Sequence, residues 1–292
     1  MMSQQIQIAI HTFDIGIRYP SLQDFKNHLL GVIRRSLDDG AGIVLMPEYT
    51  AYAATKIAAY KTRETLARLI WTEVFPDVMN ISKEYDALIC AGSAPNIHRD
   101  STSGKYRNRA ILAASGKSID SYKRCLTPWE NDFEPGTQTA FFEWKNLKFA
   151  NLFSFDLEFP EIASEIKRYS PHLVLVPSAT TDHLDSERVH RCASARAVEL
   201  GALVAVSALT GTDENNPLVA ENMGKCAVYF PAQEAFFKNV GTFGASIHDG
   251  VKTGIFNSGD HVLRHTIDVE QLIKVKRMDS ETKPFLKSIN TF

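Results

Sequence analysis

The stretch Phe149-Ala-Asn-Leu-Phe-Ser-Phe-Asp-Leu-Glu-Phe-Pro-Glu161 joins an apolar run to a polar turn and then to a Phe-Pro-Glu segment. The apolar run predicts a buried strand over 148–155, and Pro160 predicts the start of a helix over 161–169. Ser154 lies at the turn between the two, and an acid, Asp156, follows it. Strand-to-helix turns are where α/β enzymes carry nucleophiles, because such a turn exposes one side chain at the carboxyl end of the sheet. The stretch therefore indicates an α/β fold and makes Ser154 a candidate active-site residue.

Short apolar strands alternate with helical segments along the rest of the chain. We expect further strands at 6–12, 43–46, 87–92, 106–114, 118–123, 173–176, 203–208, 226–230 and 261–268. We expect helices at 22–36 and 186–200, and a helical region over 61–85 that is interrupted near Pro76. No linker rich in Pro, Gly or Ser divides the chain, so the alternation favours one domain of βα units with covered sheets.

The composition is that of a globular protein, with 292 residues, 44% hydrophobic and 23% charged residues, and a formal net charge of -2. This balance argues against nucleic acid or an anionic membrane as a partner. The amino terminus has no basic region and predicts a first strand instead of a signal peptide. No apolar stretch has the length that a bilayer requires. We therefore expect a cytoplasmic protein.

The cysteines and histidines give no metal or redox pattern. Cys90, Cys125, Cys192 and Cys226 have no short spacing between them, and the nine histidines include no His-x-x-x-His pair on a helix. In a chain of this size with cytosolic character, four such cysteines are expected to be free thiols. We expect no structural metal site.

Four polar side chains follow short apolar strands, and each has a catalytic and an ordinary interpretation. Glu48 follows 43–46, where a carboxylate beside an apolar pocket can act as a base, or it is a surface residue at a turn. Lys123 can supply a positive charge to an oxyanion, or it is a solvated strand end. Glu130 can orient Lys123, or it is an ordinary loop carboxylate. Ser154 can be a nucleophile, or it is a small residue required by a tight turn.

A serine at position 154 is a weak nucleophile in this setting. Its hydroxyl is essentially un-ionised at neutral pH, so it needs a base to take its proton. A lone carboxylate such as Glu48 is a poor activator of an alcohol, whereas it suits a thiol, whose pKa is much lower.

The order of these residues resembles the nitrilase (carbon–nitrogen hydrolase) superfamily. The chain reads Pro-Glu at 47–48, Lys-x-x-Leu-x-x-x-Glu at 123–130 and Ser-Phe-Asp-x-x-Phe-Pro-Glu at 154–161, where the family usually has Cys-Tyr-Asp-x-x-Phe-Pro-Glu. The resemblance covers roughly residues 6–270 and continues in the segments 174–179 and 196–199. Each motif alone is weak, and the ordered set is specific.

The chain also departs from the family pattern. Phe155 replaces the family's Tyr, and Cys125 lies where a His is frequent. Lys123 is favoured over Arg124 as the family lysine by its spacing to the following Leu and Glu. Ser154 occupies the position of the catalytic Cys. It is either an engineered substitution that stops turnover or a natural loss, and the intact motif around it favours engineering.

The resemblance implies a role for each residue and a fold for the chain. It makes Glu48 the general base, Lys123 the group that stabilises the tetrahedral intermediate, Glu130 a positioning residue and position 154 the nucleophile. It implies a four-layer α-β-β-α sandwich of two mixed sheets, formed by a single domain over 1–292 with a C-terminal tail from about 271. It also implies a homodimer or larger homo-oligomer without a metal or organic cofactor.

The function implied for the Cys form is hydrolysis of a small linear amide or N-carbamoyl compound through a thioester. The form with Ser154 is expected to be nearly inactive. Two alternatives stay open: a natural pseudoenzyme that binds a small amide or a protein partner, and a true nitrilase or acyltransferase that uses the same site.

Six further residues are candidates for contacts with substrate. Tyr52, Trp129 and Phe155 could line an acyl pocket, or they belong to core or dimer packing. Ser178 lies in a segment that resembles the family. His183 follows the strand at 173–176 and could bind substrate, or it is a loop histidine. Arg188 could bind a substrate carboxylate through two hydrogen bonds, or it is a surface charge.

Overall fold

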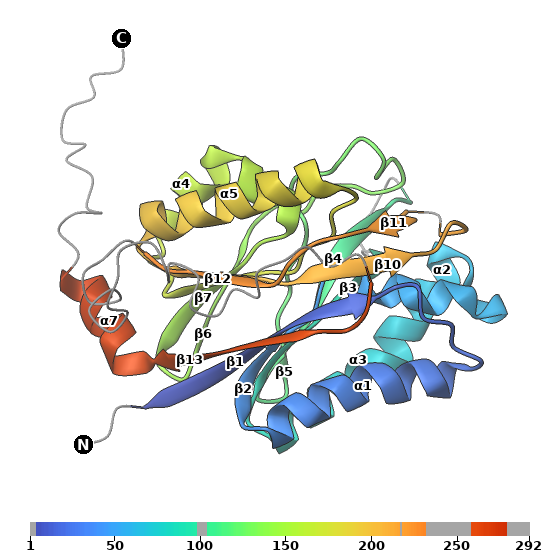
Figure 1. Cartoon of the computed structure of the whole chain (residues 1–292), viewed down its shortest axis with the longest axis horizontal. Coiled ribbons are helices and arrows are strands. Elements are labelled where there is room, and N and C mark those ends of the chain that lie inside the picture. The colour runs from blue at the N-terminus through green and yellow to red at the C-terminus, as the bar shows by residue number, and fades with distance from the viewer. Residues whose placement is uncertain (1–3, 98–103, 217, 232–257, 279–292) are drawn as a thin grey trace, which may run out of the picture.

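The computed structural model describes residues 4–97, 104–216, 218–231 and 258–278. Two β-sheets lie face to face, and helices cover the outer face of each (Figure 1). The predicted four-layer α-β-β-α sandwich of two mixed sheets is therefore confirmed.

The first sheet has eight strands, in the order β11-β10-β1-β2-β3-β4-β5, and β13 also pairs with β1. Their bounds are β1 (Gln5–Asp14), β2 (Ala41–Leu45), β3 (Leu88–Ile97), β4 (Tyr106–Ala114), β5 (Lys117–Ser118), β10 (Ala208–Thr212), β11 (Glu221–Asn222) and β13 (Val262–Asp268). β1 is parallel to β2 and β10, and β2 is parallel to β3, whereas β4 is antiparallel to β3. The carboxyl ends of β1, β2, β3 and β10 therefore share one edge of the sheet.

The second sheet has five strands, in the order β12-β9-β8-β7-β6. Their bounds are β6 (Ala140–Trp144), β7 (Leu147–Asn151), β8 (Leu173–Val176), β9 (Leu203–Val206) and β12 (Ala227–Tyr229). β7, β8 and β9 are parallel, and the outer strands β6 and β12 are antiparallel to their neighbours. The chain leaves β7 at its carboxyl end and enters the turn that carries Ser154.

The helices lie on the two outer faces, apart from α7 near the end of the chain (Figure 1). The first face is covered by α1 (Leu22–Asp38), α2 (Arg63–Leu69) and α3 (Phe75–Glu84), and the second by α4 (Pro160–Lys167) and α5 (His183–Leu200). Shorter helical segments are η1 (Thr50–Lys56), η2 (Ala58–Tyr60), η3 (Ile70–Val74) and η4 (Ser154–Glu158), and α7 spans Val269–Met278. Pro160 is in the first turn of α4, as the sequence predicted, where its missing N–H costs no helical hydrogen bond.

Alternating side chains of each strand divide the interior into three apolar cores. In β2, Val44 packs under the helices of the first face, whereas Ile43 and Leu45 point into the core between the sheets. In β8, Leu175 joins that central core and Val174 packs under α4 and α5. Successive side chains of a strand point to opposite faces, so strands covered on both sides are apolar at every position. This is why the strands appear in the sequence as continuous apolar runs.

The strand predicted at 203–208 is two strands in different sheets. β9 ends at Val206 beside β8, and β10 begins at Ala208 beside β1. Between them Ser207 donates its backbone N–H to the carbonyl oxygen of Val176 at 3.1 Å. Both halves are buried and apolar, so the sequence shows one run although the chain crosses from one sheet to the other.

Other boundaries also differ from the prediction. The strand predicted at 118–123 is reduced to β5, followed by an isolated bridge between Tyr122 and Arg109. The helical region at 61–85 is interrupted by the π-helical turn η3, which ends close to Pro76; the proline itself lies in the first turn of α3, where it is tolerated. Residues 271–278, where a tail was expected to begin, continue α7, and Leu272 is buried in the central core.

Across the described ranges, no helix combines the length and the apolar character needed to cross a bilayer.

A bulge in β3 brings the loop after β2 close to the sheet. Gly92 has φ +88°, and a Cβ placed on it would lie 2.4 Å from the carbonyl oxygen of Pro47 and 2.5 Å from Oγ1 of Thr50. The next residue, Ser93, accepts a hydrogen bond from the backbone N–H of Tyr49 at 2.9 Å. The segment 47–50, which contains Glu48, is therefore held against β3. It can lie this close only because residue 92 is a glycine and has no Cβ.

We expect Gly92→Ala to lower the free energy of unfolding by about 3 kcal/mol, because left-handed strain adds to a clash with backbone. Gly40→Ala is the matched control: its φ is +94°, but a Cβ there meets nothing within 4 Å, so a cost of about 1 kcal/mol is expected. Urea unfolding of both variants measures the difference. Equal costs would show that the close approach at Gly92 contributes nothing.

Candidate active site

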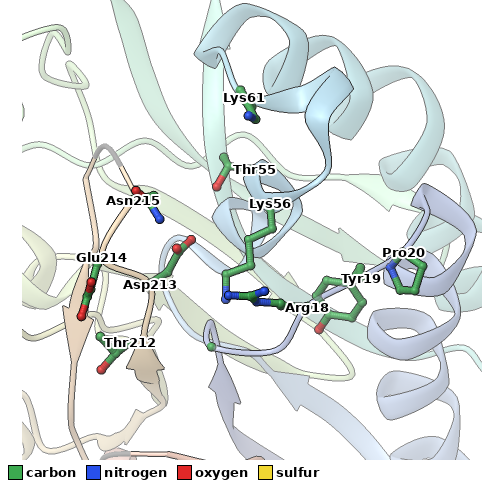
Figure 2. A pocket seen from close by; sticks show the side chains of 11 residues that line it. Arg18, Tyr19, Pro20, Thr55, Lys56, Lys61, Thr212, Asp213, Glu214 and Asn215 are labelled. Carbon is green, nitrogen blue, oxygen red and sulfur yellow. The ribbon is translucent and has the colours of Figure 1, made fainter.

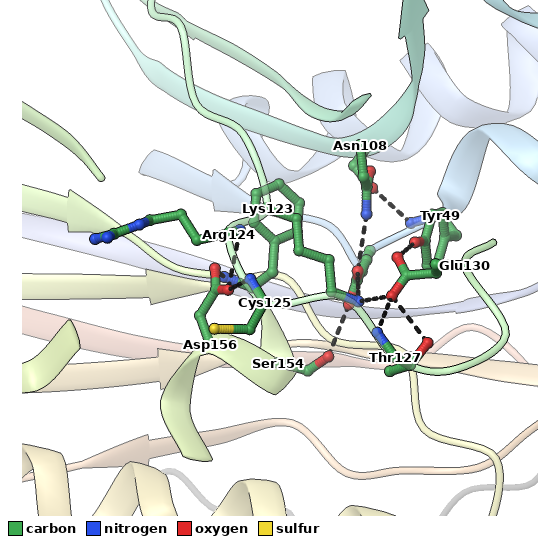
Figure 3. Close-up of polar contacts among 12 residues, drawn as sticks. Tyr49, Asn108, Lys123, Arg124, Cys125, Thr127, Glu130, Ser154 and Asp156 are labelled. Atoms are coloured by element: carbon green, nitrogen blue, oxygen red, sulfur yellow. Dashed lines mark hydrogen bonds and ion pairs between the residues drawn. The ribbon is translucent and has the colours of Figure 1, made fainter. Parts of the chain in front are cut away.

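Glu48 lies three residues beyond the end of β2 and is completely buried. Its Oε2 accepts a hydrogen bond from the Ser154 hydroxyl at 2.7 Å. Its Oε1 accepts one from Nδ2 of Asn108 at 2.8 Å and lies 3.0 Å from Nζ of Lys123 (Figure 3). The carboxylate is therefore fixed at both oxygens, with one of them directed at the candidate nucleophile.

Lys123 is the centre of this group. Its backbone N–H donates to the carbonyl oxygen of Asn108 at 2.9 Å, which ties the lysine to β4. Its Nζ lies 3.0 Å from Oε2 of Glu130 as well as 3.0 Å from Glu48. Glu130 is fixed in turn: it accepts from the N–H and hydroxyl of Thr127 at 2.7 and 2.9 Å, and from the hydroxyl of Tyr49. The ammonium is therefore held between two carboxylates.

Ser154 is the first residue of η4 and is almost fully buried. The turn is fixed by Asp156, whose carboxylate accepts from the backbone N–H of Phe153 at 3.0 Å. The same carboxylate accepts from the N–H of Cys125 at 2.7 Å and of Arg124 at 3.1 Å (Figure 3). Asp156 therefore connects the segment that carries Ser154 to the segment that carries Lys123.

Burial and mutual attraction set the ionisation of the group. Burial raises the pKa of Glu48 to about 7, partly offset by the Lys123 ammonium. Burial opposes the charge on Lys123, but Glu48 and Glu130 outweigh it and raise its pKa above the ordinary lysine value. Near neutral pH the group therefore contains a firmly charged ammonium and a carboxylate at Glu48 that can take up or release a proton.

This geometry suits acid–base chemistry at position 154. A base must lie within hydrogen-bond reach of the proton that it abstracts, and Glu48 lies 2.7 Å from the Ser154 oxygen. A buried ammonium in the same group can stabilise negative charge that develops on a substrate oxygen, because the electrostatic interaction is strong where water is excluded.

The three aromatic candidates lie in different environments. Tyr52 is fully buried and packs edge-to-face on Tyr49, with ring centroids 5.4 Å apart, so it supports the residue next to Glu48. Phe155 is half-buried and packs edge-to-face on Phe159 at 5.2 Å. Trp129 is 62% exposed.

The remaining candidates make none of the described hydrogen bonds and ion pairs with the candidate catalytic group, which consists of Glu48, Lys123, Glu130 and Ser154. Ser178 is buried, and its carbonyl oxygen accepts from the N–H of Leu209 at 2.9 Å. His183 is an exposed residue in the first turn of α5 and not in a loop. Arg188 lies on the exposed face of α5 and pairs with Asp185 at 2.6 Å and with Glu158 at 3.4 Å.

The contacts of three residues of the site were not predicted from the sequence. Asn108 is a buried amide in a strand that is otherwise flanked by arginines, which was the available signal. Tyr49 has φ +60° and places its hydroxyl on Glu130, which no pattern in the sequence indicates. Asp156 was visible in the motif, but its bonds to backbone N–H groups 31 and 32 residues away were not.

Within the described ranges there is no cluster of three or more His, Cys, Asp or Glu side chains placed to hold a metal ion. The four cysteines are free thiols, as expected.

The fold is similar to that of solved members of the nitrilase superfamily. The structure resembles Saccharomyces cerevisiae Nit3, a member of branch 10 of that superfamily, with a TM-score of 0.66, 17% identity and 96% of each chain covered. It also resembles a mutant of the amidase from Nesterenkonia sp. AN1 that shows covalent addition of the acetamide moiety of fluoroacetamide at the active site cysteine, with a TM-score of 0.63, 20% identity and 94% of each chain covered. At these identities the likeness establishes the fold.

A sequence relative points in the same direction. The chain is 23% identical over 241 residues to the probable hydrolase YhcX of Bacillus subtilis (strain 168), which covers 80% of this chain and 46% of that protein. The chain thus spans about half the length of this curated relative. No model of a known protein family matches the chain.

Removal of the buried ammonium is expected to destabilise the protein in a pH-dependent way. Lys123→Met leaves Glu48 and Glu130 buried without their cation, and loss of a buried partner costs about 3–5 kcal/mol. The cost should be largest at pH 8 and smaller at pH 5.5, because protonation of Glu48 removes uncompensated negative charge. Lys148→Met is the control: its side chain is 49% exposed and 3.9 Å from Glu143, so a change within about 0.5 kcal/mol is expected. A cost for Lys123→Met that does not vary with pH would contradict this description.

The raised pKa of Glu48 predicts the sign of a stability change with pH. The folded value of about 7 exceeds the ordinary value of 4.5, so the folded protein binds a proton that the unfolded chain has released over that range. The contribution of Glu48 to stability therefore falls as pH rises from about 4.5 to 7 and is constant above. Urea unfolding of wild type and Glu48→Gln across this range should show the wild type losing stability relative to the variant. A relative gain with rising pH would mean that the folded pKa is lowered.

Proposed function

We propose that the site is that of a carbon–nitrogen hydrolase, which cleaves a small linear amide or an N-carbamoyl compound when residue 154 carries a thiol. The observation that carries the proposal is that Glu48 contacts both the side chain at position 154 and the ammonium of Lys123. The nitrilase-superfamily fold and the probable hydrolase among the sequence relatives support it.

In the first half of the proposed reaction, Glu48 takes the proton of the thiol, and the sulfur attacks the carbonyl carbon of the substrate. The carbonyl oxygen becomes negatively charged, and Lys123 stabilises that charge. The C–N bond then breaks as Glu48 returns the proton to the leaving nitrogen, so ammonia or an amine departs and a thioester remains.

In the second half, water replaces the amine. Glu48 takes a proton from the water, whose oxygen attacks the thioester carbon, and Lys123 again stabilises the oxyanion. The C–S bond breaks, the thiol regains the proton, and the carboxylic or carbamic acid leaves. Glu130 touches no reacting atom in this scheme and acts by holding the Lys123 ammonium, 3.0 Å away, in position.

Ser154 makes the present form nearly inactive. The first step needs an ionised nucleophile, and an alcohol does not ionise near neutral pH, whereas a carboxylate with a pKa of about 7 is well matched to a thiol. The hydroxyl keeps the hydrogen bond to Glu48, so the loss affects the chemical step and not the arrangement of the site.

A second candidate function follows from the same residue. A chain that naturally carries Ser154 is a pseudoenzyme that binds a small amide without turnover. Such a protein would still bind the amide, and the buried polar group would form hydrogen bonds to it without cleaving it.

We expect Ser154→Cys to raise the rate of amide hydrolysis by about 10⁴–10⁶, since loss of a nucleophile commonly costs this much. Ammonia release from a panel of aliphatic amides, N-carbamoyl amines and nitriles measures the gain and separates amidase from nitrilase activity. Mass spectrometry of the protein after rapid quenching should detect the acyl-enzyme.

Two controls accompany this variant. The double variant Ser154→Cys with Glu48→Gln keeps the thiol but lacks the base, so it should lose the gain. Thermal shift of the protein with Ser154 and the identified substrate tests retained binding, with about 2.7 kcal/mol of stabilisation expected at a hundredfold excess over Kd. If the Cys variant forms no acyl-enzyme and releases no ammonia while the serine form still binds an amide, the pseudoenzyme interpretation replaces the hydrolase.

A further inference from the structure

A hollow lies at the carboxyl edge of the first sheet, away from the buried group around Glu48 and Lys123. It has a volume of about 1100 Å³, and its walls come from the segments that follow β1, η1 and β10 (Figure 2). β1 and β10 run parallel, so the loops that follow them meet at this edge. Ligand sites of open α/β sheets lie at such edges.

The hollow is separated from the catalytic group by the length of η1. This segment begins after Tyr49, the neighbour of Glu48, and ends at Lys56, which lines the hollow. Seven residues with a rise of roughly 2 Å each place the two ends on the order of 14 Å apart. None of Glu48, Lys123, Glu130 and Ser154 lines the hollow.

Two cations lie on one wall of the hollow. Lys56 is held there by a hydrogen bond from its Nζ to the carbonyl oxygen of Ile15 at 2.7 Å. Figure 2 shows Arg18 beside Lys56, and the Arg18 guanidinium has no hydrogen bond or ion pair to any other described residue. Burial lowers the pKa of Lys56, and the nearby Arg18 lowers it further, whereas Asp213 and Asp14 oppose this. Because Arg18 and Lys56 repel each other, a negatively charged ligand group beside them would be favoured.

A carboxylate faces them from the segment after β10. Asp213 is half-buried, and its backbone is fixed by bonds to Ala220 and Asn216, each at 2.7 Å. Its carboxylate attracts Lys56, whose Nζ is hydrogen-bonded to Ile15 instead, and these two described residues form no ion pair.

We propose that this hollow binds a small zwitterion, an α-amino acid, with its carboxylate on Arg18 and Lys56 and its ammonium on Asp213. The guanidinium can grip a carboxylate through two parallel hydrogen bonds. A phosphate would be repelled by Asp213, and a simple amine would be repelled by the two cations. A ligand that carries both charges can pair with the cations on one wall and with the carboxylate on the other.

Titration calorimetry at constant ionic strength tests the proposal with L-alanine as the zwitterion. Propionate lacks the ammonium, isopropylammonium lacks the carboxylate, and inorganic phosphate supplies the anion alone; none contains an amide that could occupy the site at Ser154. L-alanine should bind about tenfold or more tightly than each of the three, because each lacks one charge-assisted contact.

Arg18→Gln and Asp213→Asn should each weaken L-alanine binding about tenfold or more. Arg18 is exposed and has no partner among the described residues, so its replacement should leave folding unchanged. Arg35→Gln, on the exposed surface near the far end of α1, is the matched control and should leave binding unchanged. The proposal would be overturned if propionate or phosphate bound as tightly as L-alanine, or if Arg35→Gln lost L-alanine binding. It would also be overturned if L-alanine did not bind at about 50 mM. The catalytic residues play no part in it, so it stands or falls separately from the hydrolase.

Discussion

The buried ammonium of Lys123 is the interaction on which the site depends. Moving a charge out of water costs several kcal/mol, and only close partners with good geometry offset that cost. Glu48 and Glu130 supply them at 3.0 Å each, and both carboxylates are themselves satisfied by further donors, among them Asn108 and Thr127. Glu48 follows β2 and Asn108 lies in β4, whereas Thr127 and Glu130 lie in the same loop as Lys123. The polar group therefore forms only when that loop packs against the first sheet.

The backbone around Glu48 brings the carboxylates close to the Lys123 ammonium. The bulge at Gly92 lets the segment after β2 lie against β3, and Tyr49 adopts a left-handed conformation that turns its hydroxyl toward Glu130. Strain of this kind persists only where surrounding contacts determine it, and it gathers at functional sites. The same segment continues into η1, which ends at Lys56 in the wall of the hollow. This one helical segment therefore connects the site around Glu48 to the hollow.

Ser154 fits the geometry of the site, but its hydroxyl does not suit the chemistry proposed for it. Its hydroxyl makes the 2.7 Å bond to Glu48 that a nucleophile would make, and Asp156 holds the turn around it. Glu48, however, has a pKa raised to about 7, far below that of an alcohol and close to that of a thiol. The packing therefore accepts serine, whereas the chemistry proposed for the site calls for cysteine. A residue can fit a site sterically and still lack the property that the site was arranged to use.

The sequence alone determined the strand–turn–helix unit around Ser154, the apolar runs of the covered strands, and the order of Glu48, Lys123 and Glu130. These follow from local rules, namely period-two burial, proline at a helix start and polar residues after strands. Tertiary structure alone decided that the apolar run at 203–208 belongs to two sheets, because both halves are equally buried. It also decided which donors complete the site: Asn108 reaches Glu48 across 60 residues of sequence, and Ser154 does so across 106. No local pattern encodes such contacts, since they arise only when the carboxyl edges of the two sheets meet.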